Sequence, residues 1–185
     1  MRIILASQSP RRKELLSSMG FPFTVVVREV DESFPTKLEP AAAAAYIAEK
    51  KARAFTQEAA DALVIAADTI VTIDGQILGK PRDEAHAVEM LTALSGKRHD
   101  VITAVALAYK GTVDVFHDRT EVYFRNLESD EITYYIQHYH PFDKAGAYGI
   151  QEWIGLVAVE KIVGSYTNVV GLPTAKLGAE LRARR

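Results

Sequence analysis

The chain contains no cysteine among its 185 residues. A disulfide framework, a thiolate zinc site, an iron–sulfur cluster and a cysteine nucleophile are therefore excluded. No apolar run approaches the ~20 residues that a membrane-spanning helix needs. The apolar run at residues 3–6 is too short for a signal peptide. We therefore expect no membrane partner and a cytoplasmic protein.

An excess of basic charge is also missing. Lys and Arg number 22 and Asp and Glu number 24, which gives a net charge of −2. A nucleic-acid-binding surface usually leaves a basic excess, so we expect no nucleic acid partner. Residues 75–80 are not a Walker A loop, because the spacing is one residue short and no Ser or Thr follows Lys80. There is no Gly-x-Ser-x-Gly elbow, and the five histidines form no recognised metal-binding spacing.

The remaining composition is that of a globular protein, with 48% hydrophobic and 25% charged residues. The length predicts a single domain over residues 1–185. Strand-like and helix-like segments alternate, and Asp74-Gly75 is a strong signal for a tight hairpin. We expect an α/β fold, a mixed β-sheet with helices on both faces.

The pattern predicts individual elements as follows. Strands are expected at residues 3–6, 23–27, 63–67, 70–73, 76–78, 101–109, 112–124 and 156–163. Helices are expected from residue 10 to a stop at Gly20, and at 40–60, 83–94, 128–138 and 174–184.

The first helix begins with an unusual concentration of positive charge. Ser9 is a good N-cap and Pro10 fits the first helical position. Arg11, Arg12 and Lys13 then oppose the helix dipole, whose N-terminal end is positive. A bound phosphate would turn this cost into a gain, because guanidinium groups make charge-assisted contacts with phosphate. The local pattern leaves a plain solvated basic turn as an equal alternative.

Polar residues that follow apolar strands give the next candidates. Asp68-Thr69 stands where the strand at 63–67 is expected to end, and ligand sites gather at the carboxyl ends of strands. Such a carboxylate could hold a divalent cation or orient a water, or could simply cap a turn. Asp31 and Glu32 could add a second carboxylate, although alone they indicate only an acidic loop. Gln151, after a glycine-rich turn, could contact a base edge through its amide.

Taken together, these segments resemble the Maf family of nucleoside triphosphate pyrophosphatases over nearly the whole chain. The motifs that carry the resemblance are Ala6-Ser7-Gln8-Ser9-Pro10-Arg11-Arg12, Val30-Asp31-Glu32, Glu49-Lys50-Lys51-Ala52, Ala67-Asp68-Thr69, Gly79-Lys80-Pro81-Arg82, Leu94-Ser95-Gly96, the run from Asp143 to Gln151, and Val170-Gly171-Leu172-Pro173. The family often has Gly at position 8, where this chain has Gln.

The resemblance implies a reaction, a fold and a cofactor. The implied reaction is hydrolysis of a nucleoside triphosphate to the monophosphate and pyrophosphate with a divalent metal cation, Mg²⁺ or Mn²⁺. The implied fold is inosine-triphosphatase-like, with two lobes around a central cleft. At Arg12, Thr69 and Gln151 the chain is similar to the branch that acts on dTTP and UTP, with modified pyrimidine analogues as further candidates. The corresponding residues of the 7-methyl-GTP branch differ.

The resemblance also implies roles for particular residues. Asp68 is expected to be the general base, and Glu32 and Asp68 the metal ligands. The residues expected to bind substrate are Ser7, Arg11, Arg12, Lys51, Thr69, Lys80 and Gln151. Thr69 and Gln151 would hydrogen-bond the pyrimidine, and the cations would hold the triphosphate.

Other interpretations stay open at this stage. A non-catalytic nucleotide-binding regulator of cell division would use the same cations without needing Asp68. A pyrophosphatase for inosine, xanthosine or 7-methylguanosine triphosphate is another alternative. The oligomeric state is not indicated by the sequence, and a homodimer is one candidate.

Overall fold

The computed structural model describes residues 1–184, which form two compact units. The first unit comprises Met1–Thr69, Thr103–Asp118 and the described residues from Gly171 onward. The second unit comprises Ile70–Ile102 and Arg119–Val170. The two units agree with the expected division into lobes, while the expected cleft stays a prediction.

The strands form one seven-stranded sheet with the order β2-β1-β3-β5-β6-β7, and β4 pairs with β3. Their bounds are β1 Arg2–Leu5, β2 Thr24–Val25, β3 Ala62–Ile73, β4 Gln76–Leu78, β5 Arg98–Tyr109, β6 Thr112–Phe124 and β7 Val159–Val163. Strand β1 pairs in parallel with β2 and β3, whereas the pairs β3–β4 and β6–β7 are antiparallel. The mixed sheet expected from the sequence is therefore confirmed.

The α-helices are α1 Pro10–Ser18, α2 Pro40–Arg53, α3 Glu84–Leu94, α4 Ser129–Tyr139, α5 Trp153–Val157, α6 Tyr166–Val170 and α7 Thr174–Ala183. Three short 3₁₀ helices are η1 Glu58–Ala60, η2 Pro141–Asp143 and η3 Ala145–Ala147. Within residues 1–184, no helix combines the length and the apolar character that crossing a membrane would require.

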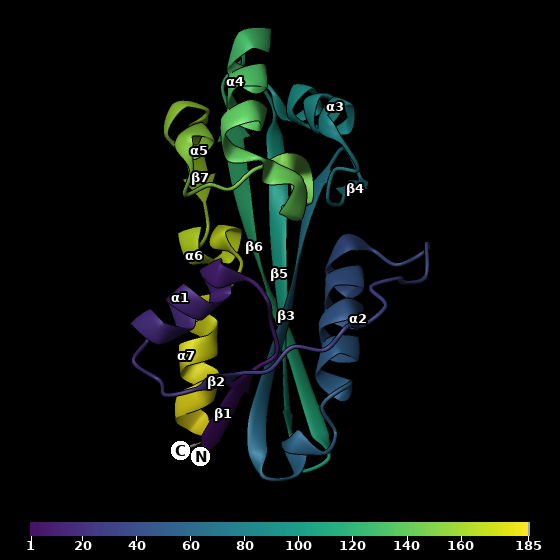
Figure 1. The fold of residues 1–185 in the computed structure, drawn as a ribbon, viewed down its shortest axis with the longest axis vertical. Helices are drawn as coiled ribbons and strands as arrows, with labels where there is room; N and C mark the ends of the chain where they lie inside the picture. The colour runs from purple at the N-terminus through teal and green to yellow at the C-terminus, as the bar shows by residue number, and fades with distance from the viewer. Residues whose placement is uncertain (185) are drawn as a thin grey trace. The chain divides into compact units, whose positions relative to one another are not determined.

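Strand alternation organises the core of the first unit. Successive side chains of a strand point to opposite faces. Leu63, Ile65 and Ala67 of β3 belong to a buried cluster with Leu16 of α1 and Leu177 of α7. The intervening β3 residues are equally buried on the opposite face. Figure 1 shows α1 and α7 on one side of these strands and α2 on the other, so the expected helices on both faces are confirmed in this unit.

Strand β3 differs from expectation in the region of Asp68. The expected strand end at Asp68-Thr69 is wrong, because β3 continues to Ile73. The residues after Asp68 are mostly β-branched and include neither Gly nor Pro, so nothing in them breaks the strand. Asp68 and Thr69 therefore lie in the interior of a long strand.

Three other expected bounds are also wrong. The helix expected at 40–60 ends at Arg53. The hydroxyl of Thr56 and the guanidinium of Arg28 bind the carbonyls of Arg53 and Ala54, which a longer helix would have used internally. The strand expected at 23–27 is only two residues long. The strand expected at 156–163 begins at Val159, because α5 takes its first residues.

The second unit contains the predicted hairpin and helix. Asp74 and Gly75 join β3 to β4 with positive φ angles of 51° and 77°, the conformation of a tight two-residue hairpin turn. Asp83 caps α3 by accepting a hydrogen bond from the backbone of His86 at 2.8 Å. The apolar face of α3 is buried, namely Ala87, Met90, Leu91 and Leu94.

Candidate active site

The alternation of β3 sends Asp68 and Thr69 to opposite faces of the strand. Asp68 follows the residues that face α2, and its carboxylate accepts a hydrogen bond from the Lys51 ammonium, with Nζ and Oδ1 2.8 Å apart. Lys51 lies in the last turn of α2. The two side chains are only 16% and 12% exposed. The pair is therefore a largely buried one, in which each charge depends on the other.

Glu32 is the second carboxylate on the same ammonium. Its Oε1 lies 2.8 Å from Lys51 Nζ, and its side chain is 46% exposed. The bound oxygens of Glu32 and Asp68 are therefore no more than twice that distance apart. The neighbouring residues form a separate pair, with Lys50 Nζ 2.9 Å from Asp31. The adjacent residues Asp31 and Glu32 thus form ion pairs with different lysines. Glu32 shares its lysine with Asp68.

Arg12 organises the other face of β3. Its Nε donates to the carbonyl of Gly171 at 2.8 Å, and its Nη2 donates to the hydroxyl of Thr69 at 3.0 Å. Its Nη1 reaches the hydroxyl of Ser7 at 3.4 Å. One guanidinium therefore joins the loop after β1, the middle of β3 and the start of the C-terminal segment.

The start of α1 has the predicted geometry. Ser9 is the N-cap, and its hydroxyl accepts from the backbone of Arg12 at 3.4 Å. Pro10 occupies the first helical position, and the first turn contains no acidic residue. Burial is the main cause that lowers the pKa of the Arg12 guanidinium, and the charge of the adjacent Arg11 lowers it further. The predicted concentration of positive charge at this helix end is present.

Burial and charge act on Asp68 in opposite directions. Desolvation raises the pKa of the Asp68 carboxyl, and the nearby cations Lys51 and Arg12 lower it. Desolvation is the larger effect, so the pKa of Asp68 lies above its ordinary value of 3.8. A carboxylate with a raised pKa is a stronger base than an exposed one. Burial also lowers the pKa of Arg12, although a guanidinium stays protonated in proteins.

Two contributors to this cluster were not assigned a role from the sequence. The hydroxyl of Thr103 in β5 lies 3.0 Å from that of Thr69, and Thr103 is fully buried. Thr103 is the one polar residue in the apolar run 101–108, and this signal could have identified it. Gly171 supplies a backbone carbonyl with φ of +126°, a conformation that favours glycine. No side-chain pattern could have indicated a carbonyl contact.

Lys80 and Gln151 belong to the second unit, and both are exposed. The backbone N–H of Gly146 donates to the carbonyl of Gly79 at 3.1 Å, which joins the segment of Lys80 to the glycine-rich segment before Gln151. In the first unit the structure therefore forms two groups on opposite faces of β3, one of Ser7, Arg12 and Thr69 and one of Glu32, Lys51 and Asp68. The assignment of Lys80 and Gln151 to the same substrate stays a prediction.

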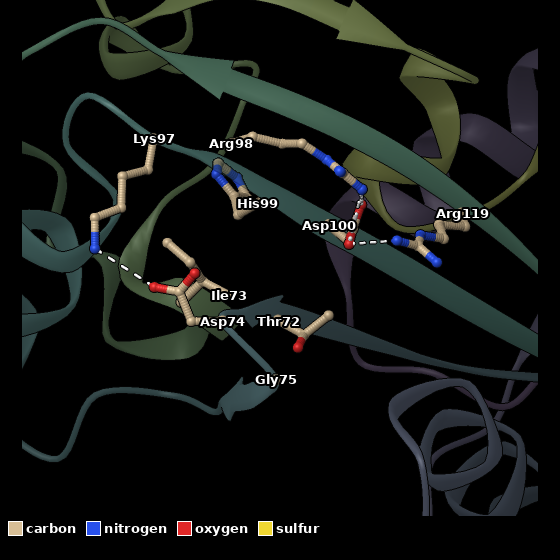
Figure 2. A pocket seen from close by; sticks show the side chains of 9 residues that line it. All are labelled: Thr72, Ile73, Asp74, Gly75, Lys97, Arg98, His99, Asp100 and Arg119. Atoms are coloured by element: carbon tan, nitrogen blue, oxygen red, sulfur yellow. Dashed lines mark hydrogen bonds and ion pairs between the residues drawn. The ribbon is translucent and has the colours of Figure 1, made fainter.

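The second unit also contains an open pocket of about 550 Å³. Figure 2 shows Lys97 directed to Asp74, and Arg98 and Arg119 both directed to Asp100. Arg119 lies 2.7 Å from Asp100 and Lys97 lies 3.5 Å from Asp74. The acidic and basic groups of this pocket thus bind one another, and none of the predicted site residues lines it. The cluster around Asp68 is the better candidate for a catalytic site.

The fold and this cluster define an α/β protein in which cations surround a buried carboxylate, an arrangement suited to phosphate chemistry. The sequence pattern described as "Maf-like protein" matches residues 2–184. The chain therefore belongs to the Maf family, as its motifs indicated.

Curated relatives match almost the full length of the chain. A protein of Bacteroides fragilis is 49% identical over 183 residues, which cover 98% of this chain and 95% of the relative. A protein of Phocaeicola vulgatus is 50% identical with the same coverage, and one of Porphyromonas gingivalis is 43% identical over 98% of this chain and 93% of the relative. All three carry the name dTTP/UTP pyrophosphatase.

Solved structures with a similar fold are the Ham1 protein of Staphylococcus aureus and a HAM1 protein of Coxiella burnetii. The first has a TM-score of 0.57 at 15% identity, with both chains covered completely. The second has a TM-score of 0.53 at 19% identity, with 99% of each chain covered. At these identities the likeness concerns the fold alone, and it agrees with the expected fold class.

Proposed function

We propose that this chain hydrolyses dTTP and UTP to the monophosphate and pyrophosphate, as a house-cleaning nucleotide hydrolase. The observation that carries the proposal is the buried Asp68 carboxylate with a raised pKa, held 2.8 Å from Lys51 in the first unit. The names of the curated relatives give the substrate class. The similarity extends over nearly the full length of both chains, so the proposal applies to the whole chain. The cytoplasmic location stays a prediction.

Asp68 is the proposed general base. A water oxygen attacks the α-phosphorus, the bond from that phosphorus to the bridging α–β oxygen breaks, and pyrophosphate leaves. The proton of the water passes to the Asp68 carboxylate, for which the raised pKa is favourable. Ser7, Arg11, Arg12 and Lys51 are proposed to hold the triphosphate, because guanidinium and ammonium groups stabilise the charge that develops on the phosphate oxygens.

A divalent cation belongs to this proposal, and the residues present fit it. Magnesium takes oxygen ligands and commonly uses one or two carboxylates together with substrate phosphates. Glu32 and Asp68 converge on one cationic group, since each lies 2.8 Å from Lys51 Nζ. Within residues 1–184 no group of three or more His, Asp or Glu side chains is arranged to hold a metal. When bound, Mg²⁺ or Mn²⁺ supplies charge that stabilises the leaving pyrophosphate.

A nucleotide panel tests the proposed function. The purified chain is incubated with Mg²⁺ and with dTTP, UTP, CTP, ATP, ITP, XTP or 7-methyl-GTP in turn, and pyrophosphate and orthophosphate are measured separately. We expect pyrophosphate from dTTP and UTP at much higher rates than from ATP or 7-methyl-GTP. EDTA should stop the release and added Mn²⁺ should restore it.

The panel also distinguishes the alternatives. Binding of dTTP without any pyrophosphate would indicate a non-catalytic nucleotide-binding protein. Faster release from ITP, XTP or 7-methyl-GTP would assign the chain to another substrate class. Orthophosphate as the primary product would place the cleavage at a different phosphate bond and would contradict the mechanism.

A further inference from the structure

The hydroxyls of Thr69 and Thr103 form a pair within the first unit. Their oxygens are 3.0 Å apart, which is hydrogen-bond distance, and either could be the donor. Thr103 is fully buried in β5, whereas Thr69 in β3 is partly exposed. Of the two protons, only that of Thr69 is therefore positioned to reach a bound ligand.

The partners of Thr69 limit what its hydroxyl can do. A hydroxyl has one proton to donate and two lone pairs to accept with. Arg12 Nη2 lies 3.0 Å from Thr69 Oγ1, and a guanidinium can only donate, so Thr69 accepts from Arg12. If Thr69 donated to Thr103, its proton would be used inside the protein. If Thr103 donates instead, both lone pairs of Thr69 are used and its proton is available to a ligand.

We propose that Thr103 donates its hydroxyl proton to Thr69, so that Thr69 donates its own proton to an oxygen of the bound nucleotide. A hydroxyl that accepts two hydrogen bonds, one from a cation, is polarised toward donating. Thr103 is then a positioning residue, because it acts through Thr69 and does not touch the substrate. This inference rests on the proposed function and deepens it, since it assigns the direction of one hydrogen bond in the same site.

The oxygen that accepts from Thr69 could belong to the base or to the triphosphate. Both sources offer an oxygen as hydrogen-bond acceptor. They differ in whether the strength of the contact depends on the identity of the base. UTP has a carbonyl oxygen where CTP has an amino group, so a contact with that oxygen would favour UTP. A contact with a phosphate oxygen would affect UTP and CTP equally. The ratio of kcat/KM for UTP to that for CTP therefore distinguishes this carbonyl, which only UTP carries, from the oxygens that both nucleotides share.

The test compares Thr103→Val with Thr103→Ser. Valine keeps the shape of threonine and loses the hydroxyl, whereas serine keeps the hydroxyl and loses the methyl. We expect Thr103→Val to lower kcat/KM for UTP about tenfold, mainly through KM, because Thr69 loses the donor that polarises its hydroxyl and orients it toward the nucleotide. Thr103→Ser should retain most of the wild-type value. A fall in the UTP-to-CTP ratio with Thr103→Val would identify the C4 carbonyl of the base as acceptor, and an unchanged ratio would identify an oxygen that both nucleotides carry, such as a phosphate oxygen.

Other outcomes would overturn the inference. Unchanged kcat/KM in Thr103→Val would show that the hydroxyl has no role, and a loss in Thr103→Ser as large as in Thr103→Val would indicate packing. If Thr103→Val does not fold, Thr103→Ala and Thr103→Ser make the same comparison, because they are both small and differ only in the hydroxyl. These results are meaningful when the wild-type chain releases pyrophosphate, and a wild type without activity would instead contradict the proposed function.

Discussion

Lys51 lies between two carboxylates, those of Glu32 and Asp68. The ammonium lowers the pKa of the Asp68 carboxyl, against the larger effect of desolvation. The neighbouring Lys50 pairs with Asp31 instead, at 2.9 Å. Substitution of Lys51 therefore tests the contact with Asp68, and the same substitution at the adjacent Lys50 is its control.

We predict that Lys51→Met lowers kcat/KM for dTTP by about tenfold or more, because a charge-assisted contact with phosphate is lost. Without the ammonium the pKa of Asp68, the proposed general base, rises, so its carboxylate becomes protonated at higher pH. The acid limb of the kcat/KM profile should therefore move to higher pH. Lys50→Met should leave both the rate and the limb unchanged. If the pH profile of Lys51→Met matched that of the wild type, the charge of Lys51 would have no effect on the ionisation of the proposed base, which would contradict this prediction.

His99 gives a prediction about stability. Its ring is 1% exposed and contacts Tyr148 through Nε2 at 2.6 Å, while Nδ1 is buried without a hydrogen-bond partner. Desolvation lowers the pKa of His99 from 6.5 to about 4. The unfolded chain therefore binds the His99 proton more tightly than the folded one. Its contribution to stability is complete above pH 6.5 and is lost as the pH falls toward 4.

The corresponding experiment compares urea unfolding of the wild type and His99→Gln from pH 7.5 to pH 4.5. The wild type should lose up to a few kcal/mol of its free energy of unfolding through this window because of His99. His99→Gln should show a flatter dependence on pH, whatever its absolute stability. His117→Gln, which changes an exposed histidine, is the control and should keep the wild-type slope. If the free energy of unfolding depended on pH equally in all three proteins, the assignment of this dependence to His99 would be contradicted.

The candidate residues of the site could be identified from the sequence, whereas the contacts that these residues make with one another could not. Arg12, Glu32, Lys51 and Asp68 all belong to motifs of the family. Nothing in the sequence pairs Lys51 with both Glu32 and Asp68, because their contact depends on the position of α2 beside β3. Thr103 was missed for a related reason, since a threonine in an apolar strand is usually a packing residue.

At the scale of elements, local signals predicted ends and turns better than lengths. The cap at Ser9 and the turn at Asp74-Gly75 depend on neighbouring residues only, and both are present. The length of β3 depends on its neighbours in the sheet, so the sequence did not indicate that the strand runs past Asp68. This error changes the account of the site, because Asp68 is held by a strand interior rather than by a loop.

The hairpin turn provides a prediction at this scale. Gly75 has φ of +77° and an added Cβ would meet nothing within 4 Å, so a substitution there tests the backbone conformation alone. Gly75→Ala should lower the free energy of unfolding by about 1 kcal/mol or more. Gly79→Ala is the matched control, because its site is equally open and its φ is not positive. Urea unfolding of both variants measures the difference, and equal stabilities would contradict the assigned turn.

For the whole molecule, the family resemblance and the physical reading of the residues support each other. The fold class was predicted from the alternation of strands and helices and the family from motifs spread over the chain, and the match over residues 2–184 confirms the family. The net charge of −2 is near balance, yet in the first unit two cations, Lys51 and Arg12, lie close enough to Asp68 to act on its carboxyl. The overall charge therefore gave no indication of this local concentration, which the fold produces.

Replacement of Asp68 by Asn tests the central claim most directly. The measurement is pyrophosphate release from dTTP with Mg²⁺, with thermal unfolding to verify the fold and Asp74→Asn as the matched control. Asp74 is exposed in the hairpin turn, at a φ that asparagine tolerates. We predict that Asp68→Asn lowers kcat about 10²–10⁴-fold, the usual contribution of a general base, while Asp74→Asn keeps the wild-type rate. Turnover near the wild-type value in a folded Asp68→Asn protein would contradict the account.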